Sequence, residues 1–314
     1  MKHGGDPSGG ALSRRALLGG LSCTLLGAAC SSGPERPAYA PGGPKSDDGA
    51  PPALGLPPRP RGAPGGEAFF ASIARATTAE REAALEEQLL AGNVPPFLRT
   101  FVPVRVRLGG RDARVFVAPD YLAIGSDEDF VRVPLVVRTA TRIAASAQAL
   151  FPTVGLVDAI YAAAELKLGS PPMAPGLGMA SSRYFVEHNR AIEAKRRARA
   201  LRLGALLAGP KKDLVLTARL LARPGRTPIY GWFREDGSVI QPLSLLHDHH
   251  HLDYTHGLRL VSTEAEIDGR RVPLLEHLVE DPTPGGPEGG SPAMLARAWS
   301  ELLRGAGAAT SSSR

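Results

Sequence analysis

The chain has 314 residues, including 36 glycines, 29 prolines and two cysteines, and its formal charge at neutral pH is +6. This length allows one large domain or two small ones. Two cysteines exclude a disulfide-rich scaffold and a four-cysteine zinc module, and no apolar run reaches the 18 residues or more of a membrane-spanning helix.

The first 29 residues have the organisation of a bacterial export signal. Paired arginines at 14–15 precede an uncharged stretch, 16–29, that is rich in Leu, Ala and Gly. This order is typical of a secretory signal, and the arginine pair resembles a twin-arginine signal. The small residues before Cys30 resemble a lipobox, with Gly27 where leucine is usual. We therefore expect Cys30 to be acylated, which would make the protein a membrane-anchored lipoprotein of the cell envelope, periplasmic or surface-facing. The alternative is an ordinary signal peptide cleaved just before it.

Composition divides the remainder into three parts. About half of the residues after Cys30, up to position 66, are proline or glycine, and such a segment cannot bury enough apolar surface to offset its ordering entropy. Residues 30–66 are therefore predicted to be a tether, residues 67–282 the folded domain, and residues 283–314 a flexible tail with a short helix. The domain has 27 Lys and Arg against 25 Asp and Glu, so much of the positive charge lies outside it.

The pattern of the domain predicts helices and strands in a mixed order. Thr77 and Glu80 have the spacing of a capping box before a helix that ends at Gly92. Alternation of apolar and polar residues over 101–108 and 113–118 predicts a β-hairpin. Further along the chain we expect a strand at 131–138, helices at 139–150, 155–168 and 181–207, strands at 213–221 and 228–233, and short helices at 274–279 and 293–303. Residues 258–262 and 266–274 are expected to form further β structure that turns at Asp268-Gly269. This order favours a single α+β domain, with antiparallel β structure flanking a central group of helices.

The strongest chemical signal is a histidine-rich run, because five of the eight histidines lie within 247–256. Imidazole transfers protons near neutral pH and is a common metal ligand. His247, Asp253 and His256 supply a nitrogen, oxygen and nitrogen set that could hold Zn²⁺ with one position open for water. The same three residues, with Tyr254, could instead act as catalytic acid and base without a metal.

The other residues of the run have different expected roles. Arg259 lies three residues beyond His256 and could hold a carboxylate or another anion. His249, His250 and His251 are the weaker candidates, because three adjacent side chains cannot converge on one point from a regular strand. The alternative for the whole run is a solvated loop that binds metal adventitiously.

Several residues elsewhere are candidates for substrate binding. Asp120 precedes an acidic glycine turn, and Lys212 opens a strand. Tyr230 and Trp232 end a strand, where they could stack on a sugar ring or pack in the core. The basic run 195–202 has no interleaved aromatic residues and is predicted to be a solvated helix face, so no nucleic-acid partner is expected.

Six blocks of the sequence resemble a family of exported bacterial proteins to which no activity is attached. They are Pro119-Asp-Tyr-Leu-Ala-Ile-Gly-Ser-Asp, Pro152-Thr-Val-Gly-Leu-Val-Asp-Ala-Ile-Tyr, Lys211-Lys-Asp, Ile229-Tyr-Gly-Trp, Ile240-Gln-Pro-Leu and Asp253-Tyr-Thr-His-Gly-Leu-Arg-Leu. The resemblance favours His247, Asp253, Tyr254, His256 and Arg259 over the three adjacent histidines, and adds Asp120, Asp158, His188 and Gln241. In that family the Tyr-Gly-Trp block is expected to continue with histidine, where this chain has Phe233.

A shorter block, Thr255-His-Gly-Leu-Arg-Leu, is similar to the Ser-His-Gly-Cys-Ile-Arg element of L,D-transpeptidases, which cross-link peptidoglycan. The nucleophilic cysteine of that element is absent here. No cysteine follows Cys30, so thiol catalysis is excluded in the mature domain. No Gly-x-Ser-x-Gly motif indicates a serine nucleophile either.

These patterns together predict an exported hydrolase that acts on a cell-wall polymer, either peptidoglycan or polysaccharide, through a His/Asp/Tyr site. Zinc is the expected cofactor if the three-residue set holds a metal, and a lipid anchor joins the protein to the membrane. Two alternatives remain open: a non-catalytic envelope lipoprotein that binds or assembles other components, and a metal-binding protein.

Overall fold

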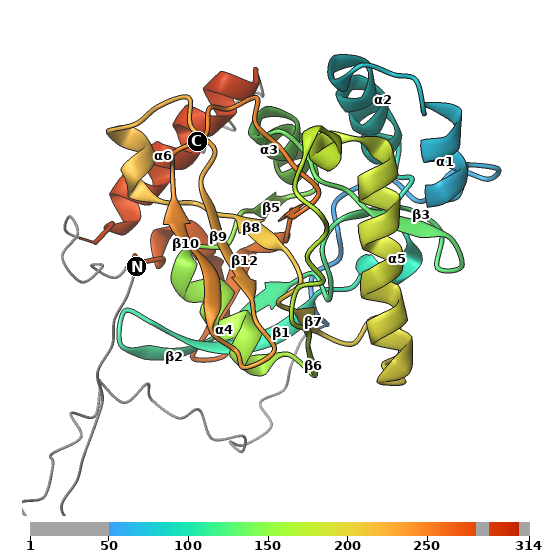
Figure 1. Cartoon of the computed structure of the whole chain (residues 1–314). Coiled ribbons are helices and arrows are strands. Elements are labelled where there is room, and N and C mark those ends of the chain that lie inside the picture. The colour runs from blue at the N-terminus through green and yellow to red at the C-terminus, as the bar shows by residue number, and fades with distance from the viewer. Residues whose placement is uncertain (1–49, 281–288, 308–314) are drawn as a thin grey trace, which may run out of the picture. The chain divides into compact units, whose positions relative to one another are not determined.

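The computed structural model describes residues 50–280 and 289–307 (Figure 1). The predicted export signal, the predicted acylation site at Cys30 and most of the predicted tether lie outside these residues, as do parts of the tail. Among the helices within the described ranges, none is long and apolar enough to cross a membrane.

Antiparallel pairing dominates the β structure. The first large sheet contains, in spatial order, β1 (Val102–Leu108), β2 (Arg111–Val117), β12 (Val261–Ile267) and β13 (Arg270–Pro273), with β5 (Ala149–Leu150) paired to β12. The second contains β10 (Val239–Ser244), β9 (Ile229–Phe233), β8 (Lys212–Leu214) and β11 (His256–Gly257). Two small pairs complete the set: β3 (Ala123–Gly125) with β4 (Phe130–Arg132), and β6 (Leu166–Lys167) with β7 (Leu207–Ala208). Only β8–β11 and β6–β7 are parallel among the described pairs.

Six α-helices accompany these strands in the described residues, which confirms the predicted α+β class. They are α1 (Gly66–Ser72), α2 (Thr78–Leu90), α3 (Val137–Ser146), α4 (Val154–Ala163), α5 (Ser182–Ala198) and α6 (Pro292–Ala306), with short 3-10 helices η1 (Pro96–Leu98), η2 (Leu177–Ala180), η3 (Ala218–Leu221) and η4 (Leu274–Glu276). The capping box of α2 is confirmed. The Thr77 side chain accepts from the Glu80 main-chain N–H, and the Glu80 carboxylate accepts from the Thr77 main-chain N–H at 2.7 Å. The β1–β2 hairpin and the turn between β12 and β13 also lie where the alternation predicts them.

Several predicted elements are shorter in the structure than the pattern suggested. The strand expected over 131–138 ends at Arg132, because Pro134 follows and α3 begins at Val137. The helix expected over 181–207 ends at Ala198. Ala200 has a positive φ of 52°, which is incompatible with a right-handed helix. The strand expected over 213–221 ends at Leu214, and η3 begins four residues later at Ala218. The sequence pattern did not predict β10.

Both ends of the folded domain extend beyond their predicted limits. Leu54 and Leu56, placed in the tether, are buried, and the Leu54 and Gly55 main-chain N–H groups donate to Arg99 and Ala147 carbonyls. Composition did not predict this contact, because burial of only two leucines is enough to attach a proline-rich segment to the domain.

The tail helix also belongs to the core. Helix α6 lies beside α3 (Figure 1), and its Trp299 contacts Phe151 edge-on, with ring centroids 5.4 Å apart. The amphipathic pattern correctly predicted the helix, but the boundary at residue 283 is wrong for this segment, because Leu295, Ala298 and Trp299 of α6 are buried.

Candidate functional site

Three side chains between β10 and the end of β11 converge on one point. His251, Asp253 and His256 offer ligand atoms that all lie within 4.8 Å of one another. Asp253 and His256 are buried, whereas His251 is partly exposed, so the cluster is open to solvent on the His251 side. We call these three residues the His/Asp cluster.

Two successive turns bring the three residues together. The first turn closes with a hydrogen bond from the His251 main-chain N–H to the Asp248 carbonyl, at 3.1 Å. The second closes with a bond of the same length from His256 N–H to the Asp253 carbonyl. Asp253 Oδ1 also accepts from the Thr255 main-chain N–H at 2.7 Å and from its hydroxyl. This leaves Asp253 Oδ2 facing the cluster, 4.0 Å from His251 Nε2.

His256 is the most buried member, with 0% of its surface exposed. Neither of its ring nitrogens has a hydrogen-bond partner among the described residues. Burial lowers the pKa of His256 to about 3, against the opposing effect of the Asp253 charge, so the imidazole is neutral at physiological pH. An unpaired buried polar group costs on the order of 1–3 kcal/mol. A neutral imidazole is the form that binds metal, so an ion in the cluster would give one of the two nitrogens a partner.

Lys212 and Trp232, both predicted to bind substrate, lie next to the His/Asp cluster. Lys212 is paired with His256 across the β8–β11 ladder. Its Nζ lies 3.8 Å from Asp253 Oδ2 and 5.0 Å from the centre of the Trp232 ring. Trp232 has a positive φ of 58°, which is rare for a bulky residue and is held by the surrounding β structure.

His251, rather than His247, completes the set, which corrects the predicted assignment. His247 is exposed and stacks on His251, with ring centroids 3.7 Å apart. The exclusion of His249–His251 assumed a regular strand, and the turn at Asp248 removes that assumption for His251. His249 and His250 are exposed beyond the turn, as expected.

Tyr254 is not part of the cluster. Its hydroxyl accepts from the Met173 main-chain N–H at 2.9 Å, and the edge of its ring meets His188 at a centroid distance of 4.8 Å. His188 is itself fully buried, with Nδ1 3.4 Å from Lys211 Nζ. The predicted acid–base partnership of Tyr254 with His256 is therefore not supported by the positions of the two side chains.

Arg259 and Asp120 are committed to the fold, which corrects their predicted contact with substrate. The Arg259 guanidinium donates to the main-chain carbonyls of Ala118, at 2.9 Å, and Leu207, at 2.6 Å. Asp120 accepts from Arg132 Nε at 2.9 Å. Both side chains are almost completely buried, so neither can reach a polymer outside the domain.

Tyr230 and Gln241, the other predicted substrate contacts, lie elsewhere. The Tyr230 hydroxyl donates to Asp158 Oδ1 at 2.9 Å. Asp158 and Gln241 line a hollow of about 750 Å³ between α4, η3 and β10, none of whose lining residues belongs to the His/Asp cluster.

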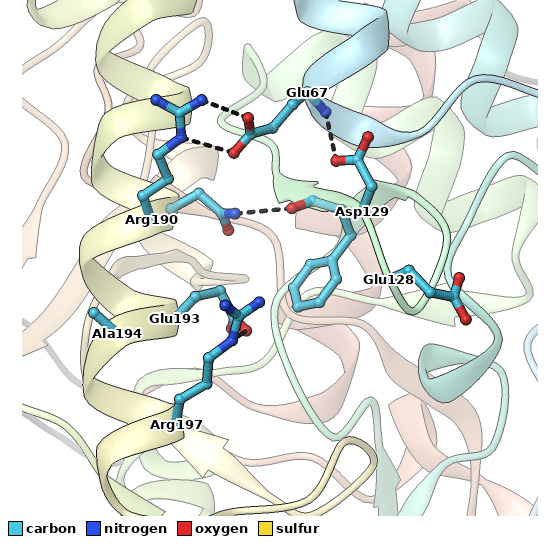
Figure 2. Close-up of a pocket in the computed structure, with 9 residues that line it drawn as sticks. Glu67, Glu128, Asp129, Arg190, Glu193, Ala194 and Arg197 are labelled. Carbon is cyan, nitrogen blue, oxygen red and sulfur yellow. Dashed lines mark hydrogen bonds and ion pairs between the residues drawn. The ribbon is translucent and has the colours of Figure 1, made fainter.

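A second hollow, of about 320 Å³, lies between α5 and the segments that hold Glu67 and Asp129 (Figure 2). Its charged groups already have partners. Arg190 Nε donates to Glu67 Oε1 at 2.7 Å, and the Glu67 main-chain N–H donates to Asp129 Oδ1 at 2.8 Å. Arg197 approaches Glu193, which is shared with the buried Arg132. This hollow is therefore a paired ionic surface, and the His/Asp cluster remains the stronger candidate.

Next to Lys212, β8 contributes a buried acid, Asp213, that was not among the predicted site residues. Asp213 accepts a hydrogen bond from the Tyr121 hydroxyl at 3.1 Å, and burial raises the pKa of Asp213 from 3.8 to about 7. Its neutral form is thus favoured in the folded state, whereas the unfolded chain ionises near pH 4. The associated stability is present below pH 4 and is lost as the pH rises towards 7.

Asp213→Asn is expected to flatten this part of the pH profile. Asparagine keeps the acceptor for Tyr121 but carries no titrating proton. Urea unfolding between pH 4.5 and 7.5 should show the wild type losing stability relative to the variant, by at most about 1.4 kcal/mol per pH unit. All other titrating groups are the same in the two proteins. Parallel curves of stability against pH for wild type and variant would therefore contradict the burial argument.

Comparison with known proteins finds no matching family, no similar curated protein and no similar solved structure. The resemblance to exported bacterial proteins therefore stays a prediction. By its fold and its site, the chain is an α+β protein with a candidate metal centre made of two histidines and one aspartate.

Proposed function

We propose that this protein binds a zinc-like divalent ion at His251, Asp253 and His256 and uses it to hydrolyse a polymer of the bacterial cell envelope. The observation that carries the proposal is the convergence of the three ligand atoms within 4.8 Å, with both nitrogens of the buried His256 unpaired. Two imidazoles and one carboxylate are a common protein ligand set for catalytic zinc.

The ligand set suits catalysis better than a closed structural site. Structural zinc sites usually have four protein ligands, whereas catalytic sites have three and leave a position for water. The cluster supplies three, and the partial exposure of His251 leaves that side accessible. A bound ion would supply Lewis-acid chemistry to water and to a carbonyl or phosphoryl group of the substrate. His251, Asp253 and His256 would hold the ion, and the Thr255 hydrogen bonds would fix the Asp253 carboxylate.

The envelope polymer in this proposal rests on the predicted export signal and lipid anchor, not on the geometry of the cluster. A protein held at the membrane surface by Cys30 would meet peptidoglycan or surface polysaccharide as its most abundant polymer. The proposal therefore has two separable parts, metal binding and hydrolysis, and each has its own test.

The first test is metal binding by the full chain, purified without a histidine tag. We expect one Zn²⁺ per chain in a calorimetric titration. His251→Ala should weaken binding by at least about 10–100-fold, because it removes a direct ligand and the loss of an outer-shell partner alone costs that much. His249→Ala is the matched control, since His249 lies two residues away, exposed and outside the cluster, and it should bind zinc as the wild type does.

The second test is hydrolysis. Zinc-loaded wild type is incubated with sacculi and with purified envelope polysaccharides, and soluble fragments are measured. Release by the wild type and the His249→Ala variant, with loss in His251→Ala, would support the proposal. Zinc binding without release from any polymer would instead favour a non-catalytic metal-binding lipoprotein. No zinc binding by the wild type would remove the proposal.

A further inference from the structure

Lys212 places a cation beside the His/Asp cluster. Paired residues of neighbouring strands point to the same side of a sheet, so Lys212 of β8 and His256 of β11 share one face. The Lys212 side chain is only 13% exposed, and its Nζ lies 3.8 Å from Asp253 Oδ2. Trp232 covers it from another side, with the ring centre 5.0 Å from Nζ.

The Lys212 ammonium makes no hydrogen bond to any described residue, although it carries three N–H donors. A largely buried ammonium without acceptors is costly, and water or a ligand must supply them. Asp253 stands beyond hydrogen-bond distance, and its second oxygen is occupied by Thr255. The cation is therefore positioned for a group that comes from outside the chain.

The charge of the cluster indicates the sign of that group. Without an ion, the negative Asp253 and the positive Lys212 balance each other across 3.8 Å, and an imidazole that binds a metal adds no charge of its own. A divalent ion adds two positive charges, and the one carboxylate that pairs with Lys212 or His251 among the described residues is Asp253, which Lys212 already balances. Uncompensated charge in a desolvated site is unfavourable, so an anion is the expected further ligand.

We infer that the centre selects an oxyanion of its substrate, a carboxylate or a phosphate, that lies between the bound ion and the Lys212 ammonium. This inference rests on the proposed metal centre. It favours polymers that carry such groups, for example the carboxylates of cell-wall peptides or the phosphodiesters of anionic glycopolymers, over neutral polysaccharides. Lys212 would bind the anion directly, while Trp232 would hold the ammonium in place.

The test separates the anion from the ion. The full chain is loaded with one zinc equivalent, freed of excess ion by gel filtration, and titrated with inorganic phosphate and, separately, with acetate. We expect at least one of these probes to bind the loaded wild type at least tenfold more tightly than the metal-free protein. The stronger probe identifies which oxyanion the site prefers.

Lys212→Gln should bind zinc at least as tightly as the wild type, because it removes a repelling charge, yet lose at least tenfold in affinity for the probe. Lys212→Arg, which keeps the charge, should lose less. Lys195→Gln is the matched control, since Lys195 is a partly exposed lysine outside the His/Asp cluster, paired with Glu235 at 2.6 Å, and it should change neither affinity. Circular dichroism checks that each variant is folded.

The possible results lead to different conclusions. If neither probe binds the loaded wild type, or if binding is unchanged in Lys212→Gln, the inference is overturned while the metal centre stands. If the wild type binds no zinc, the proposed function itself fails and the oxyanion site fails with it.

Discussion

Asp253→Asn is expected to weaken the affinity of this protein for Zn²⁺ on the order of 100-fold or more, since Asp253 provides the one negative charge among the three proposed ligands. The substitution is nearly isosteric. The asparagine oxygen can still accept from the Thr255 main-chain N–H, which fixes the second turn, so the loop should keep its shape. Competition with a chromophoric zinc chelator at pH 7.5 measures the affinity.

Asp248→Asn is the control for this prediction. Asp248 lies in the same loop and its carboxylate accepts from the His250 main-chain N–H at 2.8 Å, but it is exposed and outside the cluster. We expect its zinc affinity to stay within about threefold of the wild type, because the change leaves all three ligands in place. Equal losses in the two variants would show that general loop charge, not coordination by Asp253, holds the ion.

Arg132→Met is expected to destabilise the fold by about 3–5 kcal/mol, because it leaves two buried carboxylates without their shared cation. Arg132 is fully buried, and its guanidinium contacts Asp120 at 2.5 Å, Glu193 at 2.9 Å and Asn189 at 2.9 Å. Methionine fills much of the volume but pairs with neither acid. Urea unfolding of the folded domain at pH 7 measures the change.

Arg190→Met provides the comparison on the same side of the molecule. Arg190 pairs with Glu67 across the hollow in Figure 2, but 61% of its side chain is exposed. Exposed pairs contribute about 0–1 kcal/mol, so this variant should unfold close to the wild type. If both variants lost a similar amount, burial would not be the reason that the Arg132 pairs matter.

The buried ionic groups explain why several sequence-based site residues were misassigned. Asp120 and Arg259 are charged residues in short, distinctive blocks, and a charged residue in such a block is a reasonable candidate for ligand binding. The structure places both inside the domain, where Asp120 binds Arg132 of β4 and Arg259 binds main-chain carbonyls of Ala118, after β2, and Leu207 of β7. Their charges are needed because each satisfies polar groups that have no access to water.

The histidine run shows the same limit at closer range. The sequence indicated that residues 247–256 carry nitrogen and oxygen atoms that could bind a metal, because this depends only on composition, and the His/Asp cluster lies within this run. It did not indicate that His251 would take the place of His247, because that depends on two turns and on the pairing of β11 with β8. In that pairing His256 lies opposite Lys212, which is 44 positions earlier in the sequence.

Local chemistry therefore determined what the sequence alone could predict: the capping box at Thr77, the β1–β2 hairpin, the amphipathic α6 and the presence of a histidine-rich run. Each depends on residues a few positions apart, whose spacing sets their contacts. Only the tertiary structure decided which three side chains converge, which charges are buried, and that residues 50–66 and α6 belong to the folded body. Those features depend on contacts between segments that are distant in the sequence, and the pattern within any single segment cannot predict such contacts.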